Sequence, residues 1–251
     1  MLQLLTERLV VEVPGVSAAD QMADYCRRNR AHLGPWEPAR PLDYHSRSFW
    51  VRQLRAALDE FHAGQSVRTV LRLRQSGAPH SAPHRAPHSA PHSAPPGAPP
   101  GAPPGALGAE RIIGVANLSQ IVRGAFQSAV VGYSLDEEMV GQGLMREALD
   151  RIFRYAFEEL QLHRVMAAYR PENERSAAVL QRLGFEKEGF ARDYLFIDGA
   201  WRDHVLTALI RPTPGALRTA DEQAQRPGEE PLSEAGTSQA GGATRSLRST
   251  T

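Results

Sequence analysis

The sequence predicts a single α/β domain whose strands and helices alternate along the chain. Short β-branched segments are interleaved with longer segments whose apolar residues recur every three or four positions. When two low-complexity segments are set aside, about 180 of the 251 residues remain, which is the size of one ordinary domain. A single cysteine, Cys26, excludes a disulfide framework and a thiolate zinc site, and we expect it to be buried.

Composition also narrows the classes of function. A formal net charge of +1 argues against a nucleic-acid binder that acts through a large positive field. The N-terminal apolar run is too short for the core of a signal peptide, and no segment approaches the ~18 apolar residues of a membrane span. We therefore expect a soluble, cytoplasmic protein that binds neither nucleic acid nor membrane.

Two segments are expected to be disordered. Residues 78–105 repeat a tetrad, first Ala-Pro-His-Ser or Ala-Pro-His-Arg and then Ala-Pro-Pro-Gly, and with Ala106 and Leu107 they form the segment 78–107. Proline at this density prevents helix or sheet from propagating. Residues 213–251 are rich in small, polar and charged residues and contain no aromatic residue. The ordered domain is therefore predicted to comprise residues 1–77 and 108–212.

The repeat also carries histidines spaced four residues apart, namely His80, His84, His88 and His92. A helix would align them, but the prolines exclude a helix. We interpret the repeat as a passive linker, with weak metal binding or recognition as a polyproline ligand as alternatives. No metal site is predicted in the protein.

The first half of the domain is predicted to contain helices followed by a hairpin whose loop is the repeat. In chain order the elements are a strand at 8–13, a helix at 17–30, a rigid loop at 34–38, a helix at 46–63 and strands at 67–73 and 111–118. Extending a loop costs only about 0.6 kcal/mol per doubling of its length, so the hairpin can tolerate the repeat.

The second half alternates strand and helix and then ends in a second hairpin. In chain order the elements are a strand at 126–135, a strongly amphipathic helix at 144–160, a strand at 165–169, a helix at 174–183 and strands at 190–197 and 201–210. The last two strands are joined by Asp198-Gly199, which is typical of a tight hairpin turn.

A Gly-x-Gly turn, Gly141-Gln142-Gly143, leads directly into the amphipathic helix through Leu144 and Met145. Such a turn exposes several backbone amides in one direction, and with the helix dipole they suit a pyrophosphate. Glycine allows the ligand to approach the backbone closely. The alternative is a glycine-containing loop before a helix; the sequence of a nucleotide P-loop is absent.

A second motif begins the next helix, where Asn173 is positioned as the N-cap and Ser176 follows three residues later. Taken alone, it also fits a capped helix without any function. The two motifs lie about 30 residues apart in the order strand, Gly-x-Gly, helix, strand, Asn-x-x-Ser, helix, which is one strand–helix unit followed by another.

In this order the motifs resemble the GCN5-related N-acetyltransferase (GNAT) superfamily. The resemblance implies a single GNAT domain with a mixed, mostly antiparallel sheet flanked by helices, and acetyl-CoA as co-substrate. It implies that the Gly-x-Gly turn and its neighbours hold the pyrophosphate, and that Asn173 contacts the pantetheine arm or thioester. The implied cofactor-binding residues are Tyr133, Ser134, Leu135, Gly141, Gln142, Gly143, Leu144, Met145, Asn173 and Ser176.

The chain departs from the superfamily pattern at Val140, where Arg or Gln is usual, and at Met145, where Gly or Ala is usual. Both positions touch the pyrophosphate turn. We therefore expect backbone amides to provide most of the binding.

Further motifs resemble the RimJ branch, the ribosomal-protein-alanine N-acetyltransferases. These motifs lie at 35–38, 112–117, 143–149, 163–164, 173–176, 183–189, 193–194 and 197–205. The resemblance implies acetyl transfer to the N-terminal α-amine of a protein, with a small-subunit ribosomal protein that begins with alanine as the expected partner. The repeat and the tail lie outside the family pattern.

The resemblance also implies how the reaction is assisted. A strand amide near Tyr133–Leu135 is expected to stabilise the oxyanion. A glutamate and a tyrosine that are common in the superfamily are replaced by Val130 and Leu180. A terminal amine has a pKa near 8 against about 10.4 for lysine, so it needs little help from a base.

The candidate catalytic residues are Ser176, Asp193 and Tyr194, and the candidate substrate-binding residues are Trp36, Glu37, Trp201 and Asp203. Each has a structural alternative: helix capping for Ser176, cross-strand pairing for the Asp–Tyr pair, and core packing for the tryptophans. His163 and His204 are interpreted as structural. Two other functions remain open, a small-molecule amine acetyltransferase and a non-catalytic acyl-CoA-binding partner in ribosome assembly.

Overall fold

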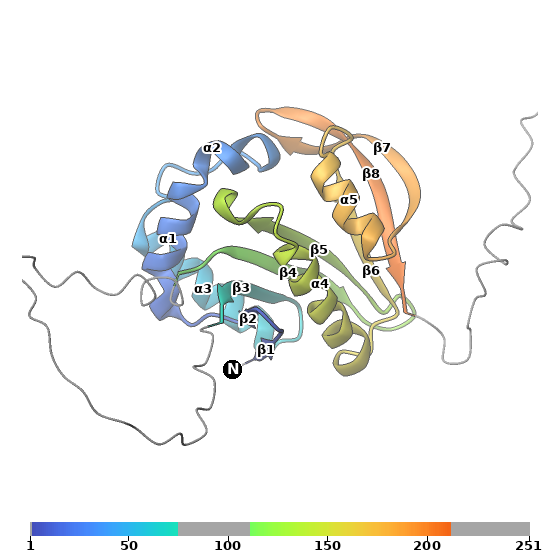
Figure 1. Ribbon diagram of the computed structural model, residues 1–251, viewed down its shortest axis with the longest axis horizontal. Coiled ribbons are helices and arrows are strands. Elements are labelled where there is room, and N and C mark those ends of the chain that lie inside the picture. Colours follow the sequence, from blue (N-terminus) through green and yellow to red (C-terminus); the bar gives the residue numbers. More distant parts are fainter. Residues whose placement is uncertain (1, 75–110, 212–251) are drawn as a thin grey trace, which may run out of the picture. The chain divides into compact units, whose positions relative to one another are not determined.

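The computed structural model describes residues 2–74 and 111–211 (Figure 1). These residues belong to one compact unit, Met1–Arg211. The predictions of a disordered insert at 78–107 and a disordered tail at 213–251 lie wholly outside the described residues.

An eight-stranded sheet forms the centre of the unit, in the order β1-β2-β3-β4-β5-β6-β8-β7. Neighbouring strands are antiparallel except β5 and β6, which are parallel, so the predicted mixed, mostly antiparallel sheet is confirmed. The strands are β1 (Gln3–Leu5), β2 (Leu9–Glu12), β3 (Val67–Leu73), β4 (Gly114–Val122), β5 (Ser128–Leu135), β6 (Arg164–Tyr169), β7 (Glu186–Ile197) and β8 (Ala200–Ile210).

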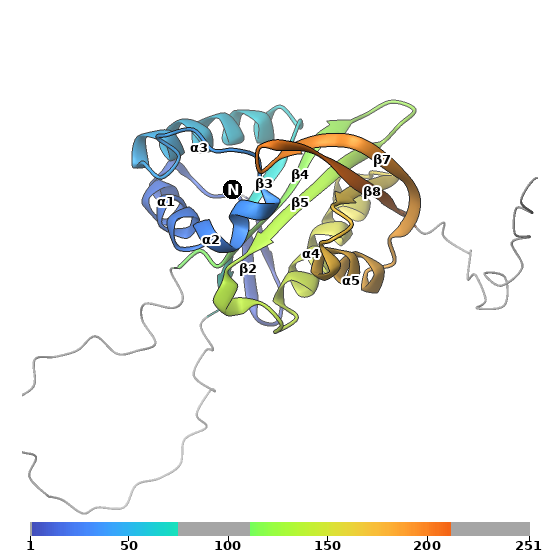
Figure 2. The same ribbon diagram turned by 90° about the horizontal axis from the view of Figure 1, so that it is seen from above.

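Helices cover both faces of the sheet. Viewed from above, α1, α2 and α3 lie on one side of it and α4 and α5 on the other (Figure 2). The helical elements are η1 (Val16–Ala18), α1 (Ala19–Arg28), α2 (Arg30–Leu33), η2 (Gly34–Trp36), α3 (Arg47–His62), η3 (Glu137–Met139), α4 (Leu144–Arg154), η4 (Tyr155–Glu159) and α5 (Glu174–Arg182).

The sheet has one cluster of buried apolar side chains on each face, and side chains that alternate along the strands contribute to both clusters. On β3, Leu71 packs in the cluster that contains α4, whereas its neighbour Val70 packs in the cluster that contains α1 and α3. Successive side chains of a strand point to opposite faces, so a nearly continuous apolar strand can serve two helical layers. Cys26 is buried in the second cluster, as expected.

The predicted strands and helices are all present, with differences in detail. The segment predicted as a rigid loop at 34–38 begins with the 3-10 helix η2, and β7 begins at Glu186 rather than at residue 190. Strand β1 was not predicted, because it has three residues and only Leu4 among them is buried. Strand β4 begins at Gly114 rather than at residue 111, although Ile112 and Ile113 before it are buried. The long amphipathic helix stops being α-helical at Arg154 and continues as a π-helix over Tyr155–Glu159.

The parallel pair β5–β6 is joined at one end only. Its register comprises Ser128↔Arg164, Ala129↔Val165 and Val130↔Met166. Beyond Val130 the strand β5 continues for five residues, still paired to β4 but not to β6. The sheet therefore opens between β5 and β6, and this opening defines the site described below.

Candidate active site

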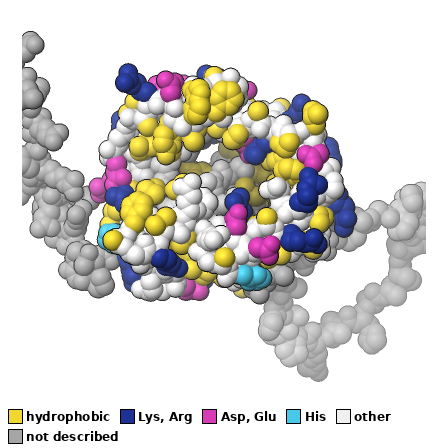
Figure 3. Space-filling view, turned by 180° about the vertical axis from the view of Figure 1, so that it is seen from behind, with side chains coloured by type: hydrophobic (Ala, Val, Ile, Leu, Met, Phe, Trp, Pro, Cys, Tyr) yellow, Lys and Arg dark blue, Asp and Glu magenta, His cyan; other side chains and the backbone are white. Residues whose placement is uncertain are grey.

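A cavity of about 990 Å³ occupies the opening between β5 and β6. Seen from behind, the surface of the molecule is hollowed near its middle (Figure 3). The lining comes from β5, the turn before α4, β6, α5, α2 and η2. Among the predicted site residues, those that line it are Trp36, Glu37, Tyr133, Ser134, Leu135, Gly141, Gly143, Leu144, Met145, Asn173 and Ser176.

Two backbone amides of β5 point toward this opening. The Asp136 amide donates to the Ile113 carbonyl on the β4 side (2.7 Å). Hydrogen-bonding direction alternates along an antiparallel strand, so Ser134 also bonds toward β4, while Tyr133 and Leu135 turn their amides to the other edge. That edge has no partner strand beyond Val130, and the two amides are therefore available to a ligand.

The Gly-x-Gly turn presents a second group of amides. Gly141 and Gly143 have φ of +85° and +77°, in the left-handed region that favours glycine, and Gly143 is the N-cap of α4. Among the described residues, none accepts a hydrogen bond from a backbone amide of residues 141–146. These amides, at the positive end of α4, suit an anion.

Arg8 binds the Gly-x-Gly turn on the side of its carbonyl groups. Its guanidinium donates to the Gln142 carbonyl (2.9 Å) and pairs with Glu147 on the first turn of α4 (2.6 Å). The Glu147 carboxylate also accepts from the Thr6 hydroxyl (2.5 Å). Burial raises the pKa of Glu147, but these hydrogen bonds outweigh it and hold the pKa below its usual value. The carbonyl side of the turn is thus occupied, while its amide side stays open.

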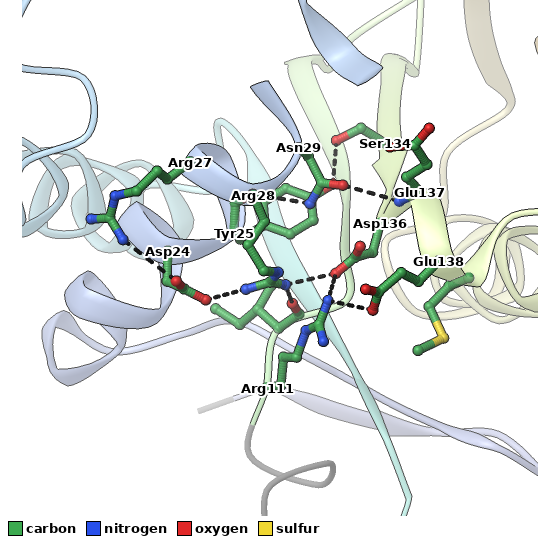
Figure 4. Close-up of polar contacts among 12 residues, drawn as sticks. Asp24, Tyr25, Arg27, Arg28, Asn29, Arg111, Ser134, Asp136, Glu137 and Glu138 are labelled. Atoms are coloured by element: carbon green, nitrogen blue, oxygen red, sulfur yellow. Dashed lines mark hydrogen bonds and ion pairs between the residues drawn. The ribbon is translucent and has the colours of Figure 1, made fainter. Parts of the chain in front are cut away.

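Helix α1 anchors the segment between β5 and that turn (Figure 4). The buried Asp136 carboxylate accepts from Arg28 (2.6 Å) and from Arg111 (2.7 Å). The Asn29 side chain accepts from the Glu137 amide (3.0 Å). Residues from two parts of the chain, Arg28 and Asn29 at the end of α1 and Arg111 before β4, therefore fix the path by which β5 enters the Gly-x-Gly turn.

Another residue of α1 reaches the wall of the cavity itself. The Tyr25 hydroxyl lies 2.9 Å from the Ser134 Oγ. Burial raises the pKa of Tyr25 well above its usual value, so this phenol keeps its proton at neutral pH. The contact holds the Ser134 side chain toward α1.

The Asn-x-x-Ser motif has a specific geometry. The Asn173 side chain accepts from the Ser176 amide (3.0 Å), which confirms the predicted N-cap of α5. The Ser176 Oγ lies 2.8 Å from the Tyr133 hydroxyl. Burial raises the pKa of Tyr133 to about 12, so the phenol is protonated at neutral pH and can donate. Strand β5 and the Asn-x-x-Ser motif therefore meet as a pair of hydroxyl groups inside the cavity.

The loop at η2 forms the opposite wall. The Pro35 carbonyl accepts from Arg170 at the end of β6 (2.7 Å), and the Arg170 guanidinium lies 5.3 Å from the centre of the Trp36 ring. The Glu37 carbonyl accepts from the Asp198 amide in the turn between β7 and β8 (3.3 Å). The loop thus spans the open side of the cavity, with Trp36 and Glu37 among its lining residues.

Four predicted residues lie on the β7–β8 hairpin outside the lining of the cavity. Asp193 sits in a bulge with φ of +48°, and its amide donates to the Asp203 carboxylate (2.8 Å). The Tyr194 ring packs 5.5 Å from the His204 ring. Trp201 is 60% exposed and packs against Phe196. Their catalytic and substrate-binding roles stay predictions.

Of the remaining predicted cofactor residues, Gln142 uses its side chain to donate to the Glu138 carbonyl (3.1 Å). The departures from the superfamily pattern are accommodated: Val140 lines the cavity, and Met145 is buried in the main core while also lining the cavity.

Some lining residues were not predicted from the sequence. His204, which we had interpreted as structural, is buried and lines the cavity. Its Nδ1 lies 2.9 Å from the Arg202 carbonyl, so Nδ1 carries the hydrogen and Nε2 is left as an acceptor. Arg146, Arg175 and Arg182 also line the cavity. No local motif marks these residues, because their place depends on how the strands and helices pack.

Comparisons with known proteins agree with this geometry. The family model described as an acetyltransferase (GNAT) domain matches residues 104–186. The chain is 40% identical over 215 residues to the ribosomal protein uS5-alanine N-acetyltransferase of Escherichia coli (strain K12), covering 85% of this chain and 94% of that protein.

Solved structures give the same relation. Ribosomal-protein-S5-alanine acetyltransferase from Vibrio fischeri matches with a TM-score of 0.68 at 33% identity, over 84% of this chain and 100% of that one. Mycobacterium smegmatis RimJ, in complex with CoA-disulfide, matches with a TM-score of 0.64 at 27% identity, over 80% of this chain and 81% of that one.

Within residues 2–74 and 111–211, no helix is long and apolar enough to cross a membrane, and no cluster of three or more His, Cys, Asp or Glu side chains could hold a metal ion.

The similarity extends over most of the chain, and the parted strands, the amide-bearing turn and the capped helix agree with it. The protein therefore belongs to the GNAT family of acetyltransferases, in its RimJ-like branch of ribosomal-protein-alanine N-acetyltransferases.

Proposed function

We propose that this enzyme transfers the acetyl group of acetyl-CoA to the N-terminal α-amine of a ribosomal protein, with an N-terminal alanine as its preferred acceptor. The observation that carries the proposal is the joining of two features in one cavity: open amides at residues 141–146 and the Tyr133–Ser176 hydroxyl pair. The relative from Escherichia coli, which is named for alanine acetylation of protein uS5, supports the choice of acceptor.

The residues present fit acetyl-CoA. The free amides of the Gly-x-Gly turn would hold its diphosphate at the N-terminus of α4. Gly143 allows the turn to form, since a residue with a side chain would be strained at this positive φ. Asn173 and the open edge of β5 would hold the pantetheine arm. Bound acetyl-CoA supplies an acetyl thioester, whose carbonyl carbon gains the bond to the amine nitrogen while its bond to sulfur breaks.

The chain's own residues would assist at three atoms. The amides of Tyr133 and Leu135 would donate to the carbonyl oxygen as it becomes negative, which is the preorganised stabilisation that acyl transfer needs. The Ser176 hydroxyl would donate a hydrogen bond to the departing sulfur, which leaves as a thiolate, while the Tyr133 hydroxyl donates to the Ser176 Oγ and keeps the serine O–H directed into the cavity.

His204 would take the proton that the amine loses. Its Nδ1–H bond to the Arg202 carbonyl leaves Nε2 as the acceptor. Tyr194 would then act by packing on the His204 ring and fixing its orientation, and Asp193 by holding the bulge that carries Tyr194. An α-amine with a pKa near 8 is partly neutral at pH 7, so one such acceptor is sufficient.

The peptide would enter past η2 and the β7–β8 hairpin. Trp36 and Glu37 line this side of the cavity, and Trp201 lies exposed on the hairpin. We propose that Trp36 and Trp201 flank the peptide and that Glu37 and Asp203 attract its cationic terminus. The expected partner is a protein N-terminus in the cytoplasm, rather than nucleic acid or membrane.

A peptide panel tests the proposed function. Peptides with free N-terminal Ala, Ser or Met, and one with a blocked terminus and an internal lysine, are incubated with acetyl-CoA and analysed by mass spectrometry. We expect acetylation of the N-terminal amine, with alanine the fastest. Acetylation of lysine but not of termini would overturn the acceptor assignment, and CoA binding without acetylation of any peptide would overturn the reaction.

A further inference from the structure

A second cavity, of about 530 Å³, adjoins the first at the N-terminus of α4. The two cavities share three lining residues, Gly143, Arg146 and Arg182. The second one therefore begins at the Gly-x-Gly turn and extends away from Asn173 and Ser176, which line only the first. Its remaining lining residues are Arg8, Glu147, Asp150, Arg154 and Leu183.

Charge pairing divides the four arginines of this second cavity into two kinds. Arg8 pairs with Glu147 (2.6 Å) and Arg154 pairs with Asp150 (2.8 Å), so the two carboxylates are neutralised within the protein. In the described part of the chain, the side chains of Arg146 and Arg182 form no hydrogen bond or ion pair with another residue. The junction of the cavities therefore carries two exposed positive charges without protein partners.

The positions of these two arginines define what they could bind. Arg146 is in the first turn of α4, beside the open amides, and Arg182 is the last residue of α5. They reach the same junction from two helices, so a group between them could be held from both sides. Guanidinium groups bind phosphate through paired, charge-assisted hydrogen bonds, and a phosphate monoester carries a charge of about −1.5 to −2 at neutral pH.

We propose that Arg146 and Arg182 form a binding site for the 3′-phosphate at the nucleotide end of CoA, and that they make the enzyme select CoA over 3′-dephospho-CoA. The proposal rests on the proposed function, in which the diphosphate is held at residues 141–146. From there the pantetheine arm extends into the first cavity, and the nucleotide extends past Gly143 into the second, where a phosphate meets both guanidinium groups.

Isothermal titration calorimetry with CoA and with 3′-dephospho-CoA tests this site without any turnover. We expect the wild type to bind CoA at least tenfold more tightly than the dephospho form. Arg146→Gln and Arg182→Gln should each weaken CoA binding about tenfold and leave the dissociation constant for dephospho-CoA within twofold, because one charge-assisted contact is worth about that factor. The double variant should bind the two ligands equally.

Arg192→Gln is the matched control. Arg192 is an exposed arginine on β7 that lines neither cavity, so the substitution makes the same change in net charge and should alter neither dissociation constant. Arg146→Lys and Arg182→Lys, which keep the charge, should retain part of the preference. Equal unfolding temperatures for all variants would establish that they are folded.

Three results would overturn the proposal. Equal affinity of the wild type for CoA and dephospho-CoA would show that no 3′-phosphate site exists, while leaving the proposed function intact. An equal loss for both ligands in the arginine variants would show that the arginines act on another part of the ligand. Failure of the wild type to bind either ligand would overturn the proposed function together with this site.

Discussion

Replacing Asp136 by Asn removes the negative charge at the centre of the network between α1 and η3 and keeps the size of the side chain. Asp136 is 2% exposed, and its carboxylate accepts from two guanidinium groups, at 2.6 and 2.7 Å. Removing one partner of a fully buried ion pair costs about 3–5 kcal/mol. The two arginines retain other partners, Asp24 and Glu138, and are partly exposed, so we expect about 2–3 kcal/mol for Asp136→Asn.

Thermal and urea unfolding measure this loss. For a domain of this size the expected decrease corresponds to a fall in Tm of about 5–10 °C. Asp24→Asn is the matched control: its carboxylate also pairs with Arg28 but is half exposed, so its loss should cost at most about 0.5 kcal/mol. An unfolding free energy of Asp136→Asn within 0.5 kcal/mol of the wild type would refute the reasoning.

The wild type and Asp136→Asn can also be compared as a function of pH. Burial raises the pKa of Asp136, but hydrogen bonds from Arg28 and Arg111 outweigh it and hold the pKa below its usual value. The folded state therefore takes up this proton less readily than the unfolded state. The stabilisation is present above the unfolded pKa, near 4, and is lost as pH falls through the lower folded pKa. The wild type should thus lose its advantage over Asp136→Asn in acid.

Three further predictions concern the site and the insert. Tyr133→Phe and Ser176→Ala should each lower kcat at least tenfold with little change in CoA affinity. The double variant should be no worse than Ser176→Ala, because the tyrosine acts through the serine. Additive losses in kcat would contradict this. His204→Gln should lower kcat/KM for an alanine peptide about 10- to 100-fold near pH 7, with a smaller deficit above pH 8, where the amine is already neutral; a deficit independent of pH would argue against proton acceptance. Deleting residues 78–107 should leave the dissociation constant for CoA nearly unchanged in calorimetry, and a large loss would show that the repeat belongs to the working structure.

Local signals account for what the sequence could predict. The helix α3 was predicted because Ser46, which caps it, and Gly64, just beyond it, mark its ends, and the Ser46 side chain indeed accepts from the Phe49 amide (3.1 Å). The turn at Gly141 and Gly143 was recognised for the same reason: its positive φ angles require glycine at two closely spaced positions. Each of these signals lies within a few residues of the structure it specifies.

Contacts between distant residues account for what the sequence could not predict. Tyr133 and Ser176 are 43 positions apart, and Arg8 lies 139 positions from Glu147. Nothing in the composition of either segment identifies its partner, since the pairing depends on how the sheet opens. The same holds for His204, whose access to the cavity follows from the place of β8 beside the parted end of β6.

The position of α1 explains why one buried carboxylate should influence both halves of the reaction. Through Tyr25, Arg28 and Asn29 the helix contacts Ser134, Asp136 and the Glu137 amide, which lie on the path from β5 to the Gly-x-Gly turn (Figure 4). The chain that leaves this helix continues directly into α2 and η2, which line the opposite wall of the cavity. A single N-terminal segment therefore sets the distance between the turn proposed to hold acetyl-CoA and the wall proposed to receive the peptide, so a substitution that loosens α1 should weaken cofactor binding and amine positioning together.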